Sequence, residues 1–390
     1  MSRRLAVFSD LFPELSQTFV SGEVRELRRQ SVDVTVYARP PDHPDPNWNG
    51  VAPVRRLHAP LNRSARRLQP MGRLAVTRPG AVISDLRACK SWGGEEPVAP
   101  LRRLAPTARA LERDGVEHIH VHFAAGAALD ALRVSRLTGI PYSVTAHAYE
   151  LYQQPANLAE KVTNASFVTV PCAYNIEQLR ALGLPTSNVH VRMLGVNTDV
   201  FRRHEAYNGD GVVLAVGRLI EKKGFATLIE AAARRDIGQV RIVGDGPLRD
   251  ELQALITRHG IDGRVSLVGT QSSEQIRGWM ERAALLVVPS VIARNGDRDA
   301  LPVVIWEALA MELPVVGTTV GGLPEAIQPP WGSVVQPGDS DALAEAIMSW
   351  RAMSADARRD AGREGRRWLH ENHRQELAVR RLLDLINLTT

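Results

Sequence analysis

The sequence has 390 residues, 44% of them hydrophobic and 23% charged. This length and composition exclude a fibrous, disordered or mini-protein chain and predict two domains of roughly 150–200 residues each. Two cysteines, Cys89 and Cys172, are too few for a disulfide framework, which favours a reducing compartment. No apolar run reaches the 18 or so residues of a membrane span, and the stretch after Arg4 is too short for a signal peptide. We therefore expect a cytoplasmic protein.

The net charge of +5 is concentrated in one segment. Residues 51–110 hold twelve basic and three acidic side chains, a net +9, so the rest of the chain is slightly acidic. A solvated surface is the simplest interpretation, and peripheral contact with the inner face of a membrane or with an acidic acceptor is the alternative. Trp92 is the only Phe, Tyr or Trp in this segment, so we expect no nucleic-acid partner.

Strand and helix patterns alternate along the first half of the chain. Strands are predicted at residues 5–8, 32–37, 119–122, 142–146, 167–170 and 189–192, and helices at 19–27, 127–138 and 174–182. Residues 40–60 are rich in Pro, Asp and Asn and predict a loop, and 61–110 predict loosely patterned helices. This alternation is typical of a parallel sheet.

A second series of strands begins after a polar interval at residues 202–210. Its strands are predicted at 212–216, 240–243, 265–268, 285–288 and 315–316, with helix patterns between them. We therefore place a domain boundary near residue 197. Each half is typical of a doubly wound α/β unit, whose ligands bind outside the carboxyl ends of the strands, so two such units predict a ligand cleft between them.

Two turns that follow predicted strands suit a phosphorylated ligand. Gly217–Gly224 carries Arg218 and Lys223, which are able to grip a diphosphate, although an ordinary charged loop explains the same residues. Gly244-Asp245-Gly246-Pro247 is either turn and cap chemistry or a backbone shelf for a nucleotide base.

Two acidic residues flank the start of a later helix. Asp299 precedes a helix that Pro302 can begin, and Glu307 lies one to two turns inside it. Such a pair suits two hydroxylated parts of one ligand, with Glu307 facing a ribose. The structural alternative makes Asp299 an N-cap and Glu307 a solvated side chain. A further glycine turn, Gly321–Glu325, follows the next strand.

Several histidines lie in the first half. His147 follows the strand at 142–146, where it is either a structural residue or part of the cleft. His118, His120 and His122 alternate on one face of a strand and imitate a metal cluster. We expect no zinc site, because neither Cys nor a set of carboxylates lies near them in the sequence.

These motifs together resemble the retaining glycosyltransferases of family 4, which have the GT-B fold. The resemblance rests, in chain order, on Gly217-Arg218 with Lys223-Gly224, Gly244–Pro247, Asp299 with Pro302 and Glu307-Ala308, and Gly321–Glu325. Residues 12–19 and the run from His120 to Ala148 are similar to the exopolysaccharide, colanic-acid-type branch.

The resemblance implies two Rossmann-like domains facing a central cleft. The acceptor-binding domain would span residues 1–196, the nucleotide-sugar-binding domain 197–373, and a C-terminal helix at about 374–390 would cross back to the first domain, with the amphipathic stretch 376–388 as the candidate.

The resemblance also implies the roles of individual residues. Arg218 and Lys223 would neutralise the donor diphosphate in place of a metal, so neither a metal nor another cofactor is implied. His147 would lie by the reacting centre. The implied catalytic residues are His147, Arg218, Lys223 and Asp299, and the implied donor-binding residues are Ser16, Gln17, Thr18, Gly217, Arg218, Lys223, Gly244, Asp245, Gly246, Asp299, Ala300, Leu301, Pro302, Val303, Glu307 and Glu325. The departing phosphate oxygen would take the acceptor's proton, so no separate base is implied.

One departure from the family pattern concerns donor selectivity. The first acid of the pair is usually Glu followed by Gly, whereas this chain has Asp299-Ala300, and the Asp side chain is shorter by about 1.5 Å.

We expect a hexosyl donor linked to UDP and a saccharide, lipid-linked or secondary-metabolite acceptor. The alternatives are a non-catalytic nucleotide-sugar-binding protein and a nucleotide-sugar 2-epimerase. A nicotinamide dehydrogenase is excluded because no Gly-x-Gly-x-x-Gly follows the first strand.

Overall fold

The computed structural model describes residues 3–14, 17–45, 48–60, 68–205, 207 and 211–389. The chain forms two compact units. The first comprises Met1–Pro171, Ile176–Met193 and Ala378–Thr390, and the second Cys172–Asn175 and Leu194–Leu377. The predicted division between residues 196 and 197 lies close to the observed division after Met193. Sequence reasoning did not anticipate that residues 172–175 belong to the second unit.

The first unit contains a seven-stranded parallel sheet in the order β3-β2-β1-β4-β5-β6-β7. Its strands are β1 (Arg4–Leu11), β2 (Asp33–Arg39), β3 (Val54–Arg56), β4 (His118–His122), β5 (Tyr142–Thr145), β6 (Val168–Val170) and β7 (Val189–Val191). The predicted strands of the first half are all present, and the short edge strand β3 lies within the segment predicted as a loop.

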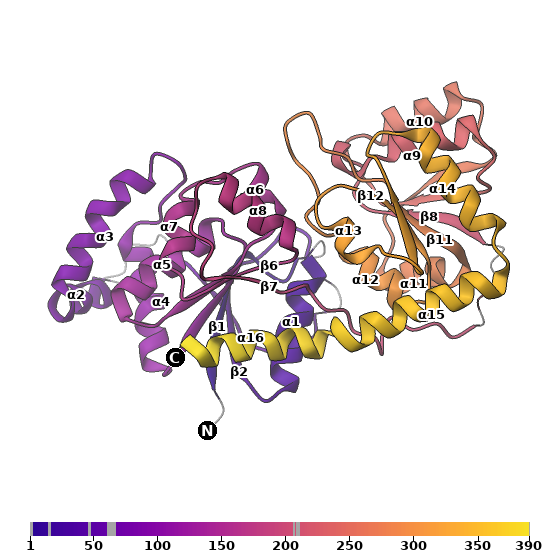
Figure 1. The fold of residues 1–390 in the computed structure, drawn as a ribbon. Coiled ribbons are helices and arrows are strands. Elements are labelled where there is room, and N and C mark those ends of the chain that lie inside the picture. Colours follow the sequence, from indigo (N-terminus) through magenta and orange to yellow (C-terminus); the bar gives the residue numbers. More distant parts are fainter. Residues whose placement is uncertain are drawn as a thin grey trace. The chain divides into compact units, whose positions relative to one another are not determined.

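Helices cover both faces of this sheet (Figure 1). They are α1 (Thr18–Arg29), α2 (Leu68–Thr77), α3 (Pro79–Trp92), α4 (Leu101–Arg113), α5 (Gly126–Thr138), α6 (Ala148–Tyr152), α7 (Leu158–Thr163) and α8 (Ala173–Ala181), with α16 (Gln375–Thr389) returning from the end of the chain. Successive side chains of β1 point to opposite faces, so Ala6 packs with α4 and α5, whereas Leu5 packs with α1 and α16.

Helix α16 packs on the first unit, as the resemblance implied. Val379, Leu382 and Ile386 recur at helical spacing and are buried in the same cluster as Leu5 and Val34. This apolar stripe explains why the last residues of the chain belong to the first unit, although the helix starts within the second.

The second unit contains a six-stranded parallel sheet in the order β10-β9-β8-β11-β12-β13. Its strands are β8 (Val212–Val216), β9 (Val240–Val243), β10 (Val265–Gly269), β11 (Ala283–Val288), β12 (Val315–Thr318) and β13 (Gly332–Val335). Its helical elements are the 3₁₀ turn η3 (Glu221–Lys223), α9 (Phe225–Arg234), α10 (Arg249–Arg258), α11 (Ser273–Arg282), α12 (Val303–Ala310), α13 (Leu323–Ala326), α14 (Ser340–Ala352) and α15 (Ala355–Asn372). Strand β13 was not predicted.

Two parallel, doubly wound sheets agree with the α/β class predicted from the sequence. None of the helices in the described ranges is long and apolar enough to cross a lipid bilayer.

Candidate active site

Four adjacent strands of the second sheet carry the predicted turns. The turns follow β8, β9, β11 and β12, which are neighbours in the order β9-β8-β11-β12. Because all are parallel, their carboxyl ends meet at one edge of the sheet. The prediction that these turns gather at one edge is therefore correct.

The glycines of the first two turns allow the backbones to touch. The amide of Leu219 donates to the carbonyl oxygen of Asp245 at 2.9 Å, and that of Gly217 to Val243 at 2.9 Å. A Cβ at Gly244, whose φ is +140°, would overlap the carbonyl oxygen of Gly217. The Asp245 side chain accepts from the amide of the adjacent Gly246 at 2.7 Å, so it stabilises the turn. It does not cap α10, whose N-cap residue is Leu248.

Lys223 and Asp299, predicted to bind different parts of a donor, contact each other. Lys223 Nζ lies 2.8 Å from Asp299 Oδ2, and Lys222 Nζ lies 3.8 Å from Oδ1 of the same carboxylate. Ser290 Oγ donates to Asp299 Oδ2 at 2.9 Å, and Lys222 also pairs with Asp297 at 3.0 Å. Asp299 therefore holds Lys223 in place.

The surroundings keep Asp299 ionised. Burial alone would raise the pKa of its carboxyl, but the charges of Lys223 and Lys222, with hydrogen bonds from Lys223 and Ser290, outweigh burial and lower the pKa below its ordinary value. A permanent negative charge thus lies beside the basic turn.

Arg218 differs from its lysine neighbours because it is exposed. Within the described ranges it has neither a hydrogen bond nor an ion pair through its side chain. A guanidinium at the N-terminal side of α9, close to the backbone amides of a glycine turn, is suited to an anionic group.

Glu307 lies half-buried in α12. Burial raises the pKa of its carboxyl to about 7, and among described residues its side chain has no hydrogen-bond or ion-pair partner. A carboxyl of this kind gains most from a ligand that donates hydrogen bonds to it, such as a pair of adjacent hydroxyls.

The remaining predicted residues of the second unit have mainly structural contacts. Gly321 has a φ of +59°, and a Cβ there would overlap the carbonyl oxygen of Asp299. The amide of Gly322 donates to Ala300 at 2.7 Å. Glu325 accepts backbone hydrogen bonds from Ala173 and Tyr174 at 2.8 and 3.0 Å, so its carboxylate already has partners. Ala300 and Leu301 are buried, Pro302 caps α12, and Val303 is its first residue.

His147 lies at the carboxyl end of β5 in the first unit, among aromatic rings. Its ring lies 5.0 Å from Phe19, 4.4 Å from Phe123 and 5.9 Å from His122, centroid to centroid. Its Nε2 atom is buried and finds no hydrogen-bond partner among the residues that the structure describes. Burial, with the nearby His122 and Arg192, lowers the pKa of His147 well below its ordinary value, so the imidazole is neutral at pH 7.

The first loop of the chain is only partly described. Thr18 begins α1, and Phe19 contacts the ring of His147. The Gln17 side chain donates to Glu14 at 2.8 Å. Ser16, predicted with them as a donor contact, lies outside the described residues.

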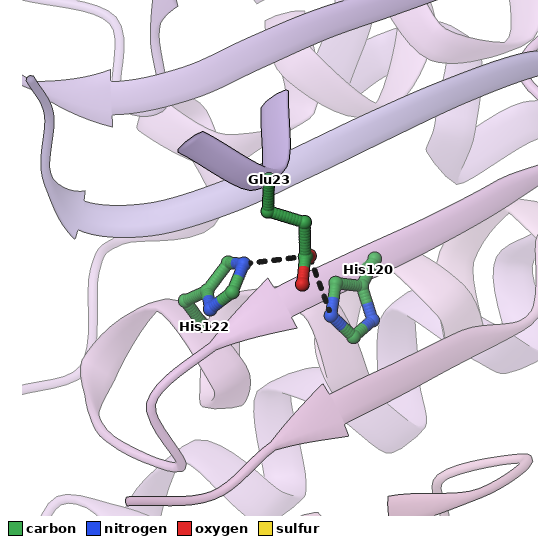
Figure 2. Close-up of side chains that lie close together, drawn as sticks. All are labelled: Glu23, His120 and His122. Carbon is green, nitrogen blue, oxygen red and sulfur yellow. Dashed lines mark hydrogen bonds and ion pairs between the residues drawn. The ribbon is translucent and has the colours of Figure 1, made fainter. Parts of the chain in front are cut away.

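The histidine strand has an acidic neighbour that is distant in the sequence. Glu23 of α1 places a carboxylate between the two rings of His120 and His122, with Oε1 at 3.6 and 3.0 Å from their Nε2 atoms (Figure 2). Its other oxygen lies 2.7 Å from Arg192 Nη1, and Arg192 also donates to Thr145 at 2.9 Å. The Arg192 guanidinium therefore pairs with this buried carboxylate.

A cavity of about 490 Å³, here called the polar cavity because charged side chains contribute to its lining, opens beside the carboxyl end of β1. Asp10, Asp130, Arg39, Arg103 and Lys161 are among its lining residues. Burial and the neighbouring Asp130 raise the pKa of the Asp10 carboxyl, and Asp10 Oδ1 accepts from the amide of Ala127 at 3.1 Å. A volume of this size suits a small ligand, and paired acidic and basic groups suit its hydroxyls.

Sequence reasoning missed several of these residues. Ser290, Asp297 and Lys222 lie beside predicted motifs, so the loop before Asp299 offered a signal for them. Glu23 and Asp10 carry no local signal, because their partners lie about a hundred residues away in the chain.

A chain with two doubly wound parallel domains, each carrying polar groups at the carboxyl edge, has the architecture of a GT-B transferase. The family model "Glycosyltransferase Family 4" matches residues 16–200, and "Glycosyl transferases group 1" matches 196–368. The chain therefore belongs to the family 4 glycosyltransferases, as the motifs indicated.

Relatives and solved structures agree with this assignment. The amylovoran biosynthesis glycosyltransferase AmsK of Erwinia amylovora is 32% identical over 186 residues, 46% of each chain. The putative colanic acid biosynthesis glycosyltransferase WcaL of Salmonella typhimurium is 27% identical over 54% of this chain and 53% of its own. The chain thus spans about half the length of these curated relatives. The structure of Anabaena HepE in complex with UDP has the same fold, with a TM-score of 0.75, 17% identity and 99% of each chain covered.

Proposed function

We propose that the protein is a retaining, metal-independent glycosyltransferase that moves a hexosyl unit from a nucleotide diphosphate sugar, preferentially a UDP-sugar, to a saccharide or natural-product acceptor. The observation that carries the proposal is the charge arrangement at one edge of the second sheet. Arg218 is exposed without a described partner, Lys223 is held by Asp299, and Glu307 carries a raised pKa. Membership of family 4 supports a nucleotide diphosphate sugar as the common ligand of these groups.

In this proposal the diphosphate binds between Arg218 and Lys223. Their positive charges stabilise the phosphate oxygen that gains negative charge as the glycosidic bond breaks, which is the task of a metal in other transferases. Asp299 orients Lys223, and its Oδ1, which has only the longer contact with Lys222, accepts a hydroxyl of the donor sugar. The backbone of residues 300–303 supports the sugar and phosphates.

The nucleoside binds through the second acid and the glycine turns. Glu307 accepts the two ribose hydroxyls, and the backbone of Gly217, Gly244, Asp245 and Gly246 supports the base. Because both oxygens of Glu325 already hold backbone amides, we assign it a positioning role.

The acceptor binds the first unit, with the cavity beside Asp10 as its site. Its hydroxyl attacks the anomeric carbon on the face from which the phosphate leaves, and the departing phosphate oxygen takes the hydroxyl proton. His147, neutral at pH 7, uses its free Nε2 to bind a hydroxyl of the sugar or acceptor. Gln17 and Thr18 approach the phosphates or the acceptor from the first loop.

Calorimetric titration of UDP, GDP, dTDP and ADP tests the donor site. We expect UDP to bind with micromolar affinity in the presence of EDTA, and Arg218→Ala to weaken it at least tenfold. Arg235→Ala is the matched control, because Arg235 is also exposed but lies at the other end of α9. Equal binding by wild type and Arg218→Ala would refute the assignment.

Product analysis separates the transferase from the alternatives. The anomeric coupling constant of the transferred sugar, measured by NMR, should show the α configuration of the donor retained. Inversion would refute the proposed mechanism. If the protein binds the nucleotide but transfers sugar to none of the acceptors tested, a non-catalytic binding protein is favoured.

A further inference from the structure

Helices α2 and α3 form a hairpin with an outer face of unusual composition. Val76, Ile83 and Leu86 are 81%, 49% and 56% exposed. Arg73, Arg87 and Lys90 are exposed on the same two helices, and Arg78 is exposed in the turn between them. Figure 1 shows α2 and α3 at the outer end of the first unit, beyond α4 and α5.

No acidic side chain opposes these basic groups on either helix within the described residues. Asp85 is buried and pairs with Arg133 at 2.8 Å. The two acids after α3 are also engaged, since Glu95 accepts from the amide of Asn157 at 2.6 Å and Glu96 pairs with Lys161 at 2.7 Å. The hairpin thus offers apolar side chains among uncompensated positive charge, which is the composition of surfaces that bind anionic bilayers.

An apolar cavity of about 630 Å³ lies at the base of the hairpin. Met71, Leu86, Cys89, Val98 and Leu101 are among its lining residues. The segment from Glu96 to Pro100 lines both this cavity and the polar cavity beside Asp10. One segment of chain therefore separates a site suited to hydroxyls from a site suited to hydrocarbon.

From this juxtaposition we propose that the acceptor is a lipid-linked saccharide, drawn from an anionic membrane on which the α2–α3 hairpin docks. The saccharide occupies the polar cavity, and the first part of the lipid chain occupies the apolar one. Val76 and Ile83 insert among the headgroups, while the four basic side chains contact anionic lipid. The inference rests on the proposed transferase function and selects one acceptor class from those that the sequence left open.

Vesicle flotation of the full chain tests the docking surface. We expect binding to vesicles of phosphatidylglycerol and phosphatidylcholine, and at least tenfold weaker binding to phosphatidylcholine alone, since each basic side chain near an anionic surface contributes about fivefold. Binding should weaken as salt rises. The double variant Val76→Asp/Ile83→Asp should bind at least tenfold more weakly, because two apolar side chains leave the interface.

The control is Met348→Asp, because Met348 is 42% exposed but lies in the second unit. It should bind vesicles like the wild type. Unchanged UDP affinity of Val76→Asp/Ile83→Asp would show that the variant is folded. Equal binding of the wild type to both vesicle types would overturn the docking surface. So would a loss of vesicle binding in Met348→Asp as large as that in Val76→Asp/Ile83→Asp. Failure of UDP to bind any form would instead count against the proposed function, so the two failures are distinguishable.

The apolar cavity is tested through Cys89. Octyl glucoside, used below its micellar concentration, should slow maleimide modification of Cys89 at least fivefold, with peptide mass spectrometry identifying the modified thiol. Methyl glucoside lacks the chain and should not protect. Equal protection by both glucosides, or by neither, would overturn the assignment of this cavity to a lipid chain.

Discussion

The raised pKa of Glu307 leads to a stability test. The carboxyl pKa moves from 4.5 to about 7 through burial, which corresponds to at most about 3 kcal/mol of unfavourable energy for the ionised folded state. Below pH 4.5 the carboxyl is protonated in both states, so it has no effect. As pH rises the unfolded chain loses the proton first, and the penalty grows until about pH 7 and then stays constant.

Replacing Glu307 by Gln removes the ionisation and keeps the shape. Because the side chain is only half-buried, water reduces the penalty, and we expect the variant to be more stable than wild type by about 1–2 kcal/mol at pH 8. For a domain of this size that is roughly 3–6 °C in denaturation temperature. At pH 4 the two proteins should denature together.

Scanning calorimetry between pH 4 and 8.5 measures this difference, and the transition that UDP shifts identifies the second unit. Glu251→Gln is the control, because Glu251 is exposed on α10, and this change should be nearly neutral at every pH. A Glu307→Gln effect that is independent of pH, or a variant less stable than wild type at pH 8, would refute the reasoning.

Three further predictions concern other residues. Asp299→Asn should lower stability by about 2–4 kcal/mol in denaturant titrations, because it leaves the Lys223 ammonium poorly paired, and an unchanged midpoint would contradict the pairing. Gly244→Ala should lower the free energy of unfolding by about 3 kcal/mol or more. Gly260 also has a positive φ but lies in open space, so Gly260→Ala should lower it by only about 1 kcal/mol. Equal losses of stability in the two variants would exclude the clash as the cause. Asp10→Asn should weaken acceptor binding in calorimetry without changing UDP affinity, and unchanged acceptor binding would remove Asp10 from the site.

The sequence predicted the fold well where the signal is local. Apolar runs marked the strands from β8 to β12, because a parallel sheet covered on both faces needs continuous hydrophobic strands. Strand β13, Gly332–Val335, escaped because four residues beginning with Gly carry little pattern. Helices α6 and α7 escaped because they are only one to two turns long.

The candidate site was predicted less completely. Glycine turns and their charged residues have sequence spacing, so Arg218 and Glu307 could be named in advance. The contact of Asp299 with Lys223 spans 76 residues, and that of Glu23 with His122 spans 99. Such pairs depend on which strands become neighbours, and no local pattern in one sequence contains that information.

The surroundings push the two carboxyls at the edge of the second sheet toward opposite protonation states. Lysines keep Asp299 ionised, whereas burial leaves Glu307 titrating near pH 7. If Glu307 accepts the ribose hydroxyls, its ionised form binds UDP better, so binding must lower its pKa and release a proton.

Affinity for UDP should therefore rise with pH through about 7 and level off above it. Calorimetry at pH 7 in two buffers of different ionisation enthalpy measures the proton released, which should reach a few tenths per UDP in wild type and vanish in Glu307→Gln. Proton release that persists in the variant would place the titrating group elsewhere. Uptake in wild type would mean that the ligand favours the protonated carboxyl, and Glu307 would then act as a hydrogen-bond donor to the nucleotide.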